Sequence, residues 1–230
     1  YELAKILKDR FNVAKIFLVG RSWGSLIGLL TVRHYSELFH AFVGIGQLVH
    51  PLLNDSLSYK YTLQLAQRYG DTAEIEELKS IGNPPYNSEK ATRQRKWLTK
   101  YDELFMREKF NRHRPDYRAH LLSTPEYSLW DVLMMGIDPF YSSRHLWNEK
   151  YYQYNLFEQI PEIEIPVYFL HGRYDYFTPG ELVEKYYQRL SAPKGKTMIW
   201  FEKSGHEPEF YEPGKFRKVM VKEVLKDVHM

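Results

Sequence analysis

Residues 16–25 read IFLVGRSWGS, and this stretch decides the fold that the rest of the chain is expected to adopt. Ile16 to Val19 form an apolar run that ends at a glycine, which is typical of a buried strand in a parallel sheet. Apolar residues then recur on one side of a predicted helix, at Leu26, Ile27, Leu29 and Leu30. Gly20 and Gly24 flank Ser22 in a G-x-S-x-G pattern. We expect both glycines to remove Cβ atoms that would clash where strand and helix approach each other.

A serine at such a sharp strand-to-helix turn exposes its hydroxyl beyond the edge of the sheet. Ser22 also precedes a helix N-terminus, where free N–H groups and the helix dipole favour a nearby negative charge. We therefore interpret Ser22 as a candidate nucleophile and the backbone N–H of Trp23 as a candidate oxyanion donor. The alternative is that Ser22 only caps the helix, a position that serine favours.

A serine nucleophile needs a base to take its proton and an acid to orient that base. Two further apolar strand patterns, 167–172 and 198–201, run directly into loops that carry Asp175 and His206. Because parallel strands end at one edge of a sheet, we expect both side chains to lie near Ser22. Two ordinary alternatives stay open: Asp175 closes a turn, and His206, one of nine histidines, lies on the surface. His171 is expected to be structural, packing beneath the loop of Asp175.

Three segments together resemble the α/β-hydrolases: GRSWGS at 20–25, HGRYDYFTP at 171–179 and SGHEPEFYEPGKF at 204–216. The resemblance is closest to the capped group that includes proline iminopeptidases and epoxide-hydrolase-like enzymes. It spans nearly the whole chain and implies a triad of Ser22, Asp175 and His206, in the chain order of that family. Epoxide-cleaving relatives carry a carboxylate at the turn, so the serine here implies acyl transfer to and from Ser22.

The spacing of the predicted strands indicates an α/β fold with an insertion. A strand at 41–46 is followed by the next one only at 167, although a helical crossover needs ~12 residues. The residues between these two strands include four segments whose apolar residues have helical spacing, at 59–69, 73–81, 88–110 and 129–135. Helices are predicted again at 179–190 and 213–227. We expect a mostly parallel sheet of the α/β-hydrolase type, formed by 1–47 and 161–230, with a helical cap at 48–160.

Sequence says less about the substrate. Tyrosines are frequent in the expected cap, and aromatic rings with hydroxyl tips can line an apolar pocket or simply pack the cap. An aminopeptidase needs a carboxylate for the substrate ammonium, whereas a carboxylesterase does not. Arg21, Tyr141 and Glu103 are the candidate substrate-binding residues. No metal-ligand spacing occurs, and the expected chemistry needs no metal and no cofactor.

Composition excludes several other functions. Basic and acidic residues are interspersed, 32 against 29, so the net charge of +3 gives no field that suggests nucleic acid. No run approaches the ~18 apolar residues that span a bilayer, and no signal-peptide pattern opens the chain. The lack of cysteine fits a reducing compartment, and we expect a cytoplasmic protein whose partner is a small-molecule or short-peptide substrate.

The segment before Ser22 raises a competing interpretation. Only 19 residues precede Gly20, and they hold no HGG-like motif, which in this family supplies the second oxyanion donor. The alternative to an enzyme is therefore a catalytically silent fragment or a binding protein on the same fold. We also expect the strand at 15–19 to lack a neighbour on one side. Through that edge the chain would self-associate or bind a separate N-terminal fragment.

Overall fold

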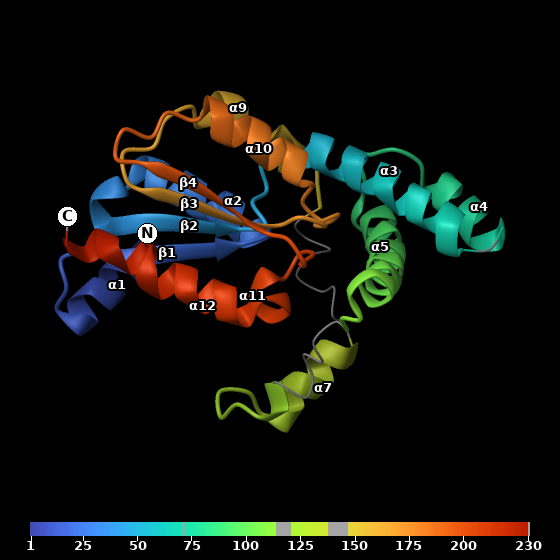
Figure 1. Ribbon diagram of the computed structural model, residues 1–230, viewed down its shortest axis with the longest axis horizontal. Coiled ribbons are helices and arrows are strands. Elements are labelled where there is room, and N and C mark those ends of the chain that lie inside the picture. Colours follow the sequence, from blue (N-terminus) through green and yellow to red (C-terminus); the bar gives the residue numbers. More distant parts are fainter. Residues whose placement is uncertain (71, 114–120, 138–146, 230) are drawn as a thin grey trace. The chain divides into compact units, whose positions relative to one another are not determined.

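The computed structural model describes residues 1–70, 72–113, 121–137 and 147–229 (Figure 1). The chain forms two compact units, Tyr1–Ser58 with Gln153–Met230 as unit 1 and Tyr59–Tyr152 as unit 2. Their boundary falls within the helix α3 (Pro51–Tyr69). Unit 2 lies inside the segment 48–160 that the sequence predicts as a cap, and its role as a cap stays a prediction. None of the described helices is long and apolar enough to cross a membrane.

Unit 1 is built on a parallel sheet of four described strands, as the sequence predicts (Figure 1). The strands lie in the order β1-β2-β3-β4 and comprise Ile16–Arg21, Phe39–Ile45, Val167–Gly172 and Lys196–Phe201. Their carboxyl ends are aligned, since Gly20 pairs with Gly44 and Gly44 with Phe169. The central strands β2 and β3 are almost entirely buried, which explains their continuous apolar sequences.

Helices cover both faces of this sheet. The helix α2 (Trp23–His34) packs against β2 so closely that a Cβ atom on Gly28 would lie 2.4 Å from the Phe42 ring. The helix α10 (Gly180–Arg189) packs through Tyr186 against Phe169 of β3. The helix α12 (Pro213–Lys222) covers the opposite face. Leu170 follows Phe169 on β3 and therefore points to that face, because successive strand residues alternate. There Leu170 shares a core cluster with Val219 of α12.

The end of the chain differs from the sequence prediction of one helix at 213–227. The structure has α12, then a 3-10 helix η3 (Val224–His229). This break lets Val224 join the core cluster of Val43, Leu170 and Phe201. A helix that the sequence analysis missed, α1 (Glu2–Phe11), opens the chain, and Ala4 is its one buried residue.

Shorter helices complete unit 1. The helix α9 (Leu156–Gln159) precedes β3, a 3-10 helix η1 (Ser36–Leu38) precedes β2, and α11 (Pro208–Tyr211) follows the loop of His206. The chain leaves and re-enters unit 1 at neighbouring points, because the N–H of Leu156 donates to the carbonyl of Val49 at 3.0 Å.

Unit 2 is helical in its described part, and the predicted helices are confirmed. It contains the end of α3, then α4 (Thr72–Ile81), α5 (Ser88–Phe110), α7 (Leu129–Ile137) and the start of a 3-10 helix η2 (Tyr151–Gln153). The long helix α5 begins where the Asn87 side chain accepts a hydrogen bond from the Lys90 N–H at 2.9 Å. Leu98 and Tyr101 on its inner face are fully buried.

The strand β1 ends the strand order and pairs only with β2 among the described strands, so its outer edge is unpaired there. Large apolar side chains are also exposed on and around β1. Val19 is 46% exposed. Further exposed apolar residues on α1, the following loop and α2 are Leu3, Ile6, Phe11, Val13 and Ile27. An unpaired, apolar strand edge is a template for pairing with another polypeptide.

We expect the 230-residue chain, studied alone, to self-associate or to bind a separate polypeptide along β1. Val19→Lys should weaken self-association about tenfold, because it places a charge where burial of a valine contributes ~1.5 kcal/mol or more. Size-exclusion chromatography with light scattering over a dilution series measures this. Val221→Lys, at an exposed apolar position on α12, is the control. A stable monomer whose β1 amides resist hydrogen exchange would contradict the prediction.

Candidate active site

Ser22 lies at the turn between β1 and α2 in a strained backbone conformation. Its φ is 53° and its ψ is −121°, a region that side-chain-bearing residues rarely adopt. The Ser22 N–H donates to the carbonyl of Ile45, the last residue of β2, at 2.8 Å. The turn is therefore bonded to the carboxyl end of the neighbouring strand, which offsets the backbone strain.

The two glycines of the turn play different roles. A Cβ atom on Gly20 would lie 2.4 Å from the carbonyl oxygen of Gly24, so only glycine fits there, as predicted. A Cβ atom on Gly24 would meet no described atom within 4 Å, apart from the neighbouring backbone of its own helix. The prediction that Gly24 also prevents a clash is wrong, because its Cβ direction leads into open space.

Asp175 and His206 are brought together directly. Asp175 follows β3 and is 4% exposed, and His206 follows β4 and is 7% exposed. The Nδ1 of His206 lies 2.9 Å from Oδ2 of Asp175. A carboxylate only accepts hydrogen bonds, so Nδ1 carries the proton and the other ring nitrogen, Nε2, is left to act as a base. The ring of Phe177 stacks on the imidazole at 5.1 Å and limits its rotation.

Asp175 is held as a carboxylate by its hydrogen bonds. Oδ1 accepts from the N–H groups of Phe177 and Thr178 at 2.9 and 2.8 Å, and Oδ2 accepts from the Thr178 hydroxyl at 2.6 Å. Burial by itself would raise the pKa of the Asp175 carboxyl. The interaction with the His206 imidazole and the hydrogen bonds from His206 and Thr178 outweigh burial and hold the pKa at about 2. Asp175 is therefore ionised throughout the pH range in which a histidine ordinarily titrates.

Gly46 follows the strand residue that accepts from the turn of Ser22 and packs against the His206–Asp175 pair. It follows Ile45, to which Ser22 is bonded, and its own N–H donates to the carbonyl of Leu170 at 3.1 Å. A Cβ atom at Gly46 would lie 3.0 Å from two atoms of the His206 ring and 3.2 Å from Oδ2 of Asp175. The loops that follow β3 and β4 thus meet against one residue without a side chain at the end of β2. Sequence reasoning missed Gly46, and its position after a predicted strand was the available signal.

His171 supports this arrangement from the core. It is fully buried, and its Nε2 donates to the carbonyl of Thr178 at 2.8 Å. Its Nδ1 is buried with no hydrogen-bond partner among the described residues. Burial lowers the pKa of His171, because a second ring proton would have no acceptor. The neutral His171 ring fixes the turn that carries Asp175, which agrees with the expected structural role.

The structure describes three of the other four candidate residues. Trp23 is the first residue of α2, so its N–H lies in the first helical turn. Arg21 is the last residue of β1 and donates from Nη1 to Oε1 of Glu209 at 3.0 Å. Glu103 is exposed on α5 in unit 2, and Tyr141 lies outside the described residues.

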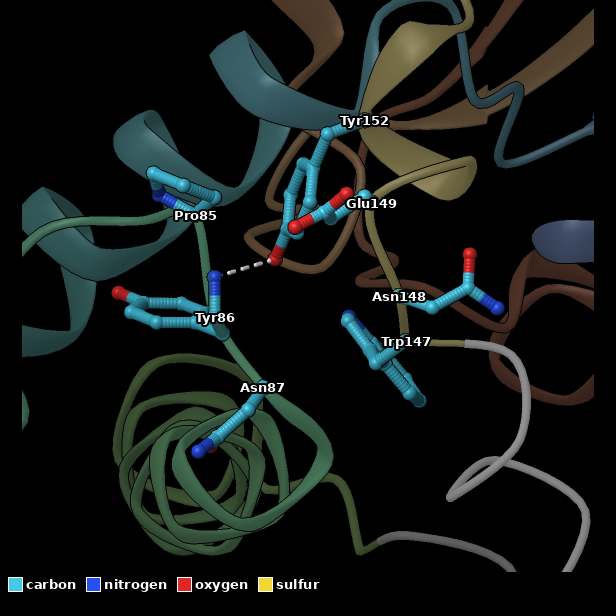
Figure 2. A pocket seen from close by; sticks show the side chains of 7 residues that line it. All are labelled: Pro85, Tyr86, Asn87, Trp147, Asn148, Glu149 and Tyr152. Carbon is cyan, nitrogen blue, oxygen red and sulfur yellow. Dashed lines mark hydrogen bonds between the residues drawn. The ribbon is translucent and has the colours of Figure 1, made fainter.

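Unit 2 contains a pocket of about 480 Å³ between the start of α5 and the residues before η2 (Figure 2). Its wall is formed by Pro85, Tyr86, Asn87, Trp147, Asn148, Glu149 and Tyr152. Figure 2 shows the Tyr86 N–H donating to the Tyr152 hydroxyl, at 2.9 Å. The indole Nε1 of Trp147 is buried without a hydrogen-bond partner among the described residues, whereas Glu149 is exposed. Sequence reasoning missed this set, because the residues come from two segments that carry no recognisable motif.

Known proteins resemble this chain over nearly all of its length. Residues 1–213 match a family model described as alpha/beta hydrolase fold. A probable aminopeptidase, YbaC of Bacillus subtilis (strain 168), is 28% identical over 222 residues, which cover 95% of this chain and 68% of that protein.

Solved structures show the same fold. The proline iminopeptidase of Mycobacterium smegmatis matches with a TM-score of 0.60 and 16% identity, covering 96% of this chain and 68% of that chain. An esterase from Exiguobacterium antarcticum matches with a TM-score of 0.56 and 15% identity, covering 95% and 69%. At these identities the likeness concerns the fold and not the substrate.

The geometry around Gly46 predicts that Gly46→Ala disables the cluster. The new methyl group would press on the His206 ring and sit at a φ of 53°, so we expect labelling of Ser22 by a fluorophosphonate to slow at least tenfold. Gly82→Ala is the matched control, because φ there is 74° and a Cβ atom meets no described atom within 4 Å. It should lose ~1 kcal/mol of stability and keep its labelling rate. Equal losses of labelling in both variants would contradict the role of Gly46.

Proposed function

Because the chain belongs to the α/β-hydrolase fold family, we propose that it is a serine hydrolase that cleaves an ester or an amide through an acyl-enzyme. The observation that carries this proposal is the buried His206–Asp175 hydrogen bond of 2.9 Å beside the strained turn of Ser22. An oriented imidazole with Nε2 available as a base is what a serine hydroxyl needs in order to become a nucleophile.

In the proposed reaction, Ser22 Oγ attacks the substrate carbonyl carbon and passes its proton to Nε2 of His206. Asp175 holds the imidazole in the required tautomer and stabilises the imidazolium that forms. The negative charge on the carbonyl oxygen is stabilised by the N–H of Trp23 at the start of α2. His206 then protonates the leaving amine or alcohol. A water molecule, deprotonated by His206, then attacks the acyl carbon of the Ser22 ester. The bond to Oγ breaks, His206 returns its proton to Ser22, and the acid is released.

For the substrate we propose a peptide with a free N-terminus, with a carboxylester as the second candidate. The probable aminopeptidase to which the chain is 28% identical supports the first. Within unit 2, the pocket formed by Tyr86, Trp147, Tyr152 and Glu149 offers aromatic rings and a carboxylate, the groups that hold an ammonium ion. Glu103 and Tyr141 stay further candidates for substrate contact. A cytoplasmic location of the reaction also stays a prediction.

The competing proposal is a silent protein of the same fold, since Trp23 supplies one oxyanion donor and no second donor is assigned. Losing one such donor costs on the order of 10²–10³ in rate. Labelling by a fluorophosphonate distinguishes the two proposals, because this probe reacts with an activated serine whatever the natural substrate is.

We expect a fluorophosphonate probe to label the protein and Ser22→Ala to abolish labelling completely. His206→Gln should reduce labelling at least a hundredfold, because the general base is lost. Mass spectrometry of the labelled peptide identifies the modified residue, and circular dichroism shows that each variant is folded. An unlabelled wild-type protein would favour the silent alternative, and labelling that survives Ser22→Ala would show that another residue is the nucleophile.

The two substrate classes predict different effects at Glu149. If the substrate is a peptide, Glu149→Gln should raise KM for an aminoacyl p-nitroanilide roughly tenfold or more, the value of one lost charge-assisted hydrogen bond. Hydrolysis of p-nitrophenyl acetate should change less than twofold. Glu126→Gln, at another exposed carboxylate of unit 2, is the control. An unchanged KM for the aminoacyl substrate would remove Glu149 from substrate binding.

A further inference from the structure

We propose that Arg21 is a positioning residue, which joins the turn of the nucleophile to the loop of the base through an ionic link to Glu207 and Glu209. The proposal rests on the proposed roles of Ser22 and His206. Its subject is the alignment of these two residues and not the chemistry that they perform.

The link connects the immediate neighbours of both residues. Arg21 directly precedes Ser22, and Glu207 directly follows His206. Nη1 of Arg21 lies 3.0 Å from Oε1 of Glu209 and 3.9 Å from Oε1 of Glu207. One guanidinium therefore contacts two carboxylates on the segment that leaves the His206 loop and enters α11. The contact with Glu209 joins residues 188 positions apart in the sequence.

The two carboxylates of the link are more deeply buried than the guanidinium. The side chain of Glu207 is 4% exposed and that of Glu209 is 20% exposed. A buried carboxylate is costly unless a charged or hydrogen-bonding partner compensates it. Oε2 of Glu209 is itself buried and has no hydrogen-bond partner among the described residues. The Arg21 side chain is itself 39% exposed, so the link joins a guanidinium that solvent reaches to carboxylates that are more deeply buried. A guanidinium offers several N–H donors in a fixed fork, whereas an ammonium is a single point charge.

The start of the His206 loop is anchored in a different way. Oε2 of Glu212 accepts hydrogen bonds from the Lys203 N–H at 2.8 Å and from the Ser204 hydroxyl at 2.7 Å. Gly172 and Gly205 are in such close contact that a Cβ atom on Gly172 would lie 1.9 Å from the Gly205 carbonyl oxygen. Loss of Arg21 therefore leaves these contacts of the loop in place and removes its ionic link to the turn of Ser22.

Loss of this link should lower the rate of reaction without weakening substrate binding, because a displacement of about 1 Å in catalytic geometry costs on the order of a hundredfold in rate. We expect Arg21→Met, which keeps the apolar stem, to lower kcat for p-nitrophenyl acetate and the rate of fluorophosphonate labelling 10- to 100-fold, with KM within twofold. Arg21→Lys should recover part of the loss. The exchanged pair Arg21→Glu with Glu209→Arg should recover more than either single variant.

Arg68→Met is the control, because Arg68 forms an ion pair with Glu108 in unit 2, whereas both loops belong to unit 1. It should leave kcat and labelling unchanged. A rise in KM alone for Arg21→Met would show that Arg21 binds substrate, as the sequence suggested. A loss of thermal stability with unchanged kcat would show that the link is only structural. Either result would overturn the proposal.

A measurement that does not depend on catalysis tests the role of Arg21 independently of the proposed function. The Nδ1 proton of His206, hydrogen-bonded to Asp175, should be observable by NMR in the wild-type protein and should exchange with water faster in Arg21→Met. If the wild-type protein is not labelled by the probe, the proposed function fails while this measurement still decides whether Arg21 orders the His206 loop. Equal exchange in the two proteins would refute the positioning role.

Discussion

Close approach of one backbone to another at the carboxyl ends of β1, β2 and β3 governs the arrangement of unit 1. Each of these ends carries or adjoins a glycine whose Cβ atom would overlap a neighbour: Gly20 with the Gly24 carbonyl, Gly46 with the His206 ring, Gly172 with the Gly205 carbonyl. A parallel sheet brings strand ends to one edge, but side chains would keep the loops apart. The absence of three side chains is what allows the turn of Ser22 and the loops of Asp175 and His206 to pack closely at these strand ends.

Protein partners compensate the buried titratable groups at these strand ends. The carboxylate of Asp175 is surrounded by hydrogen-bond donors, His171 stays neutral because a second proton has no acceptor, and Glu207 faces a guanidinium. Each group is costly to bury alone. The buried groups therefore depend on one another, and a substitution at one of them is felt at the others through the same few contacts.

The sequence predicted the strands and most helices because their apolar patterns are strong and local. The strand β3 was predicted at its observed bounds, and α5 likewise, whereas α1 was missed because little of it is buried. Ser22, Asp175 and His206 were recognisable because each follows a predicted strand within a known motif. Gly46 and the Arg21–Glu209 pair were not, since a lone glycine carries no motif and contacts across 188 residues leave no local pattern. The pocket of unit 2 depends on the packing of two separate segments and was equally invisible.

The hydrogen bond between Leu156 and Val49 has a consequence for how such a chain can diversify. The points where the polypeptide departs from unit 1 and returns to it are held together by unit 1 itself. The intervening stretch can then lengthen, shorten or be exchanged at little entropic cost, because loop closure depends only weakly on length. Transplanting that stretch from a relative of different selectivity, cut at these two residues, would leave the register of β2 and β3 untouched.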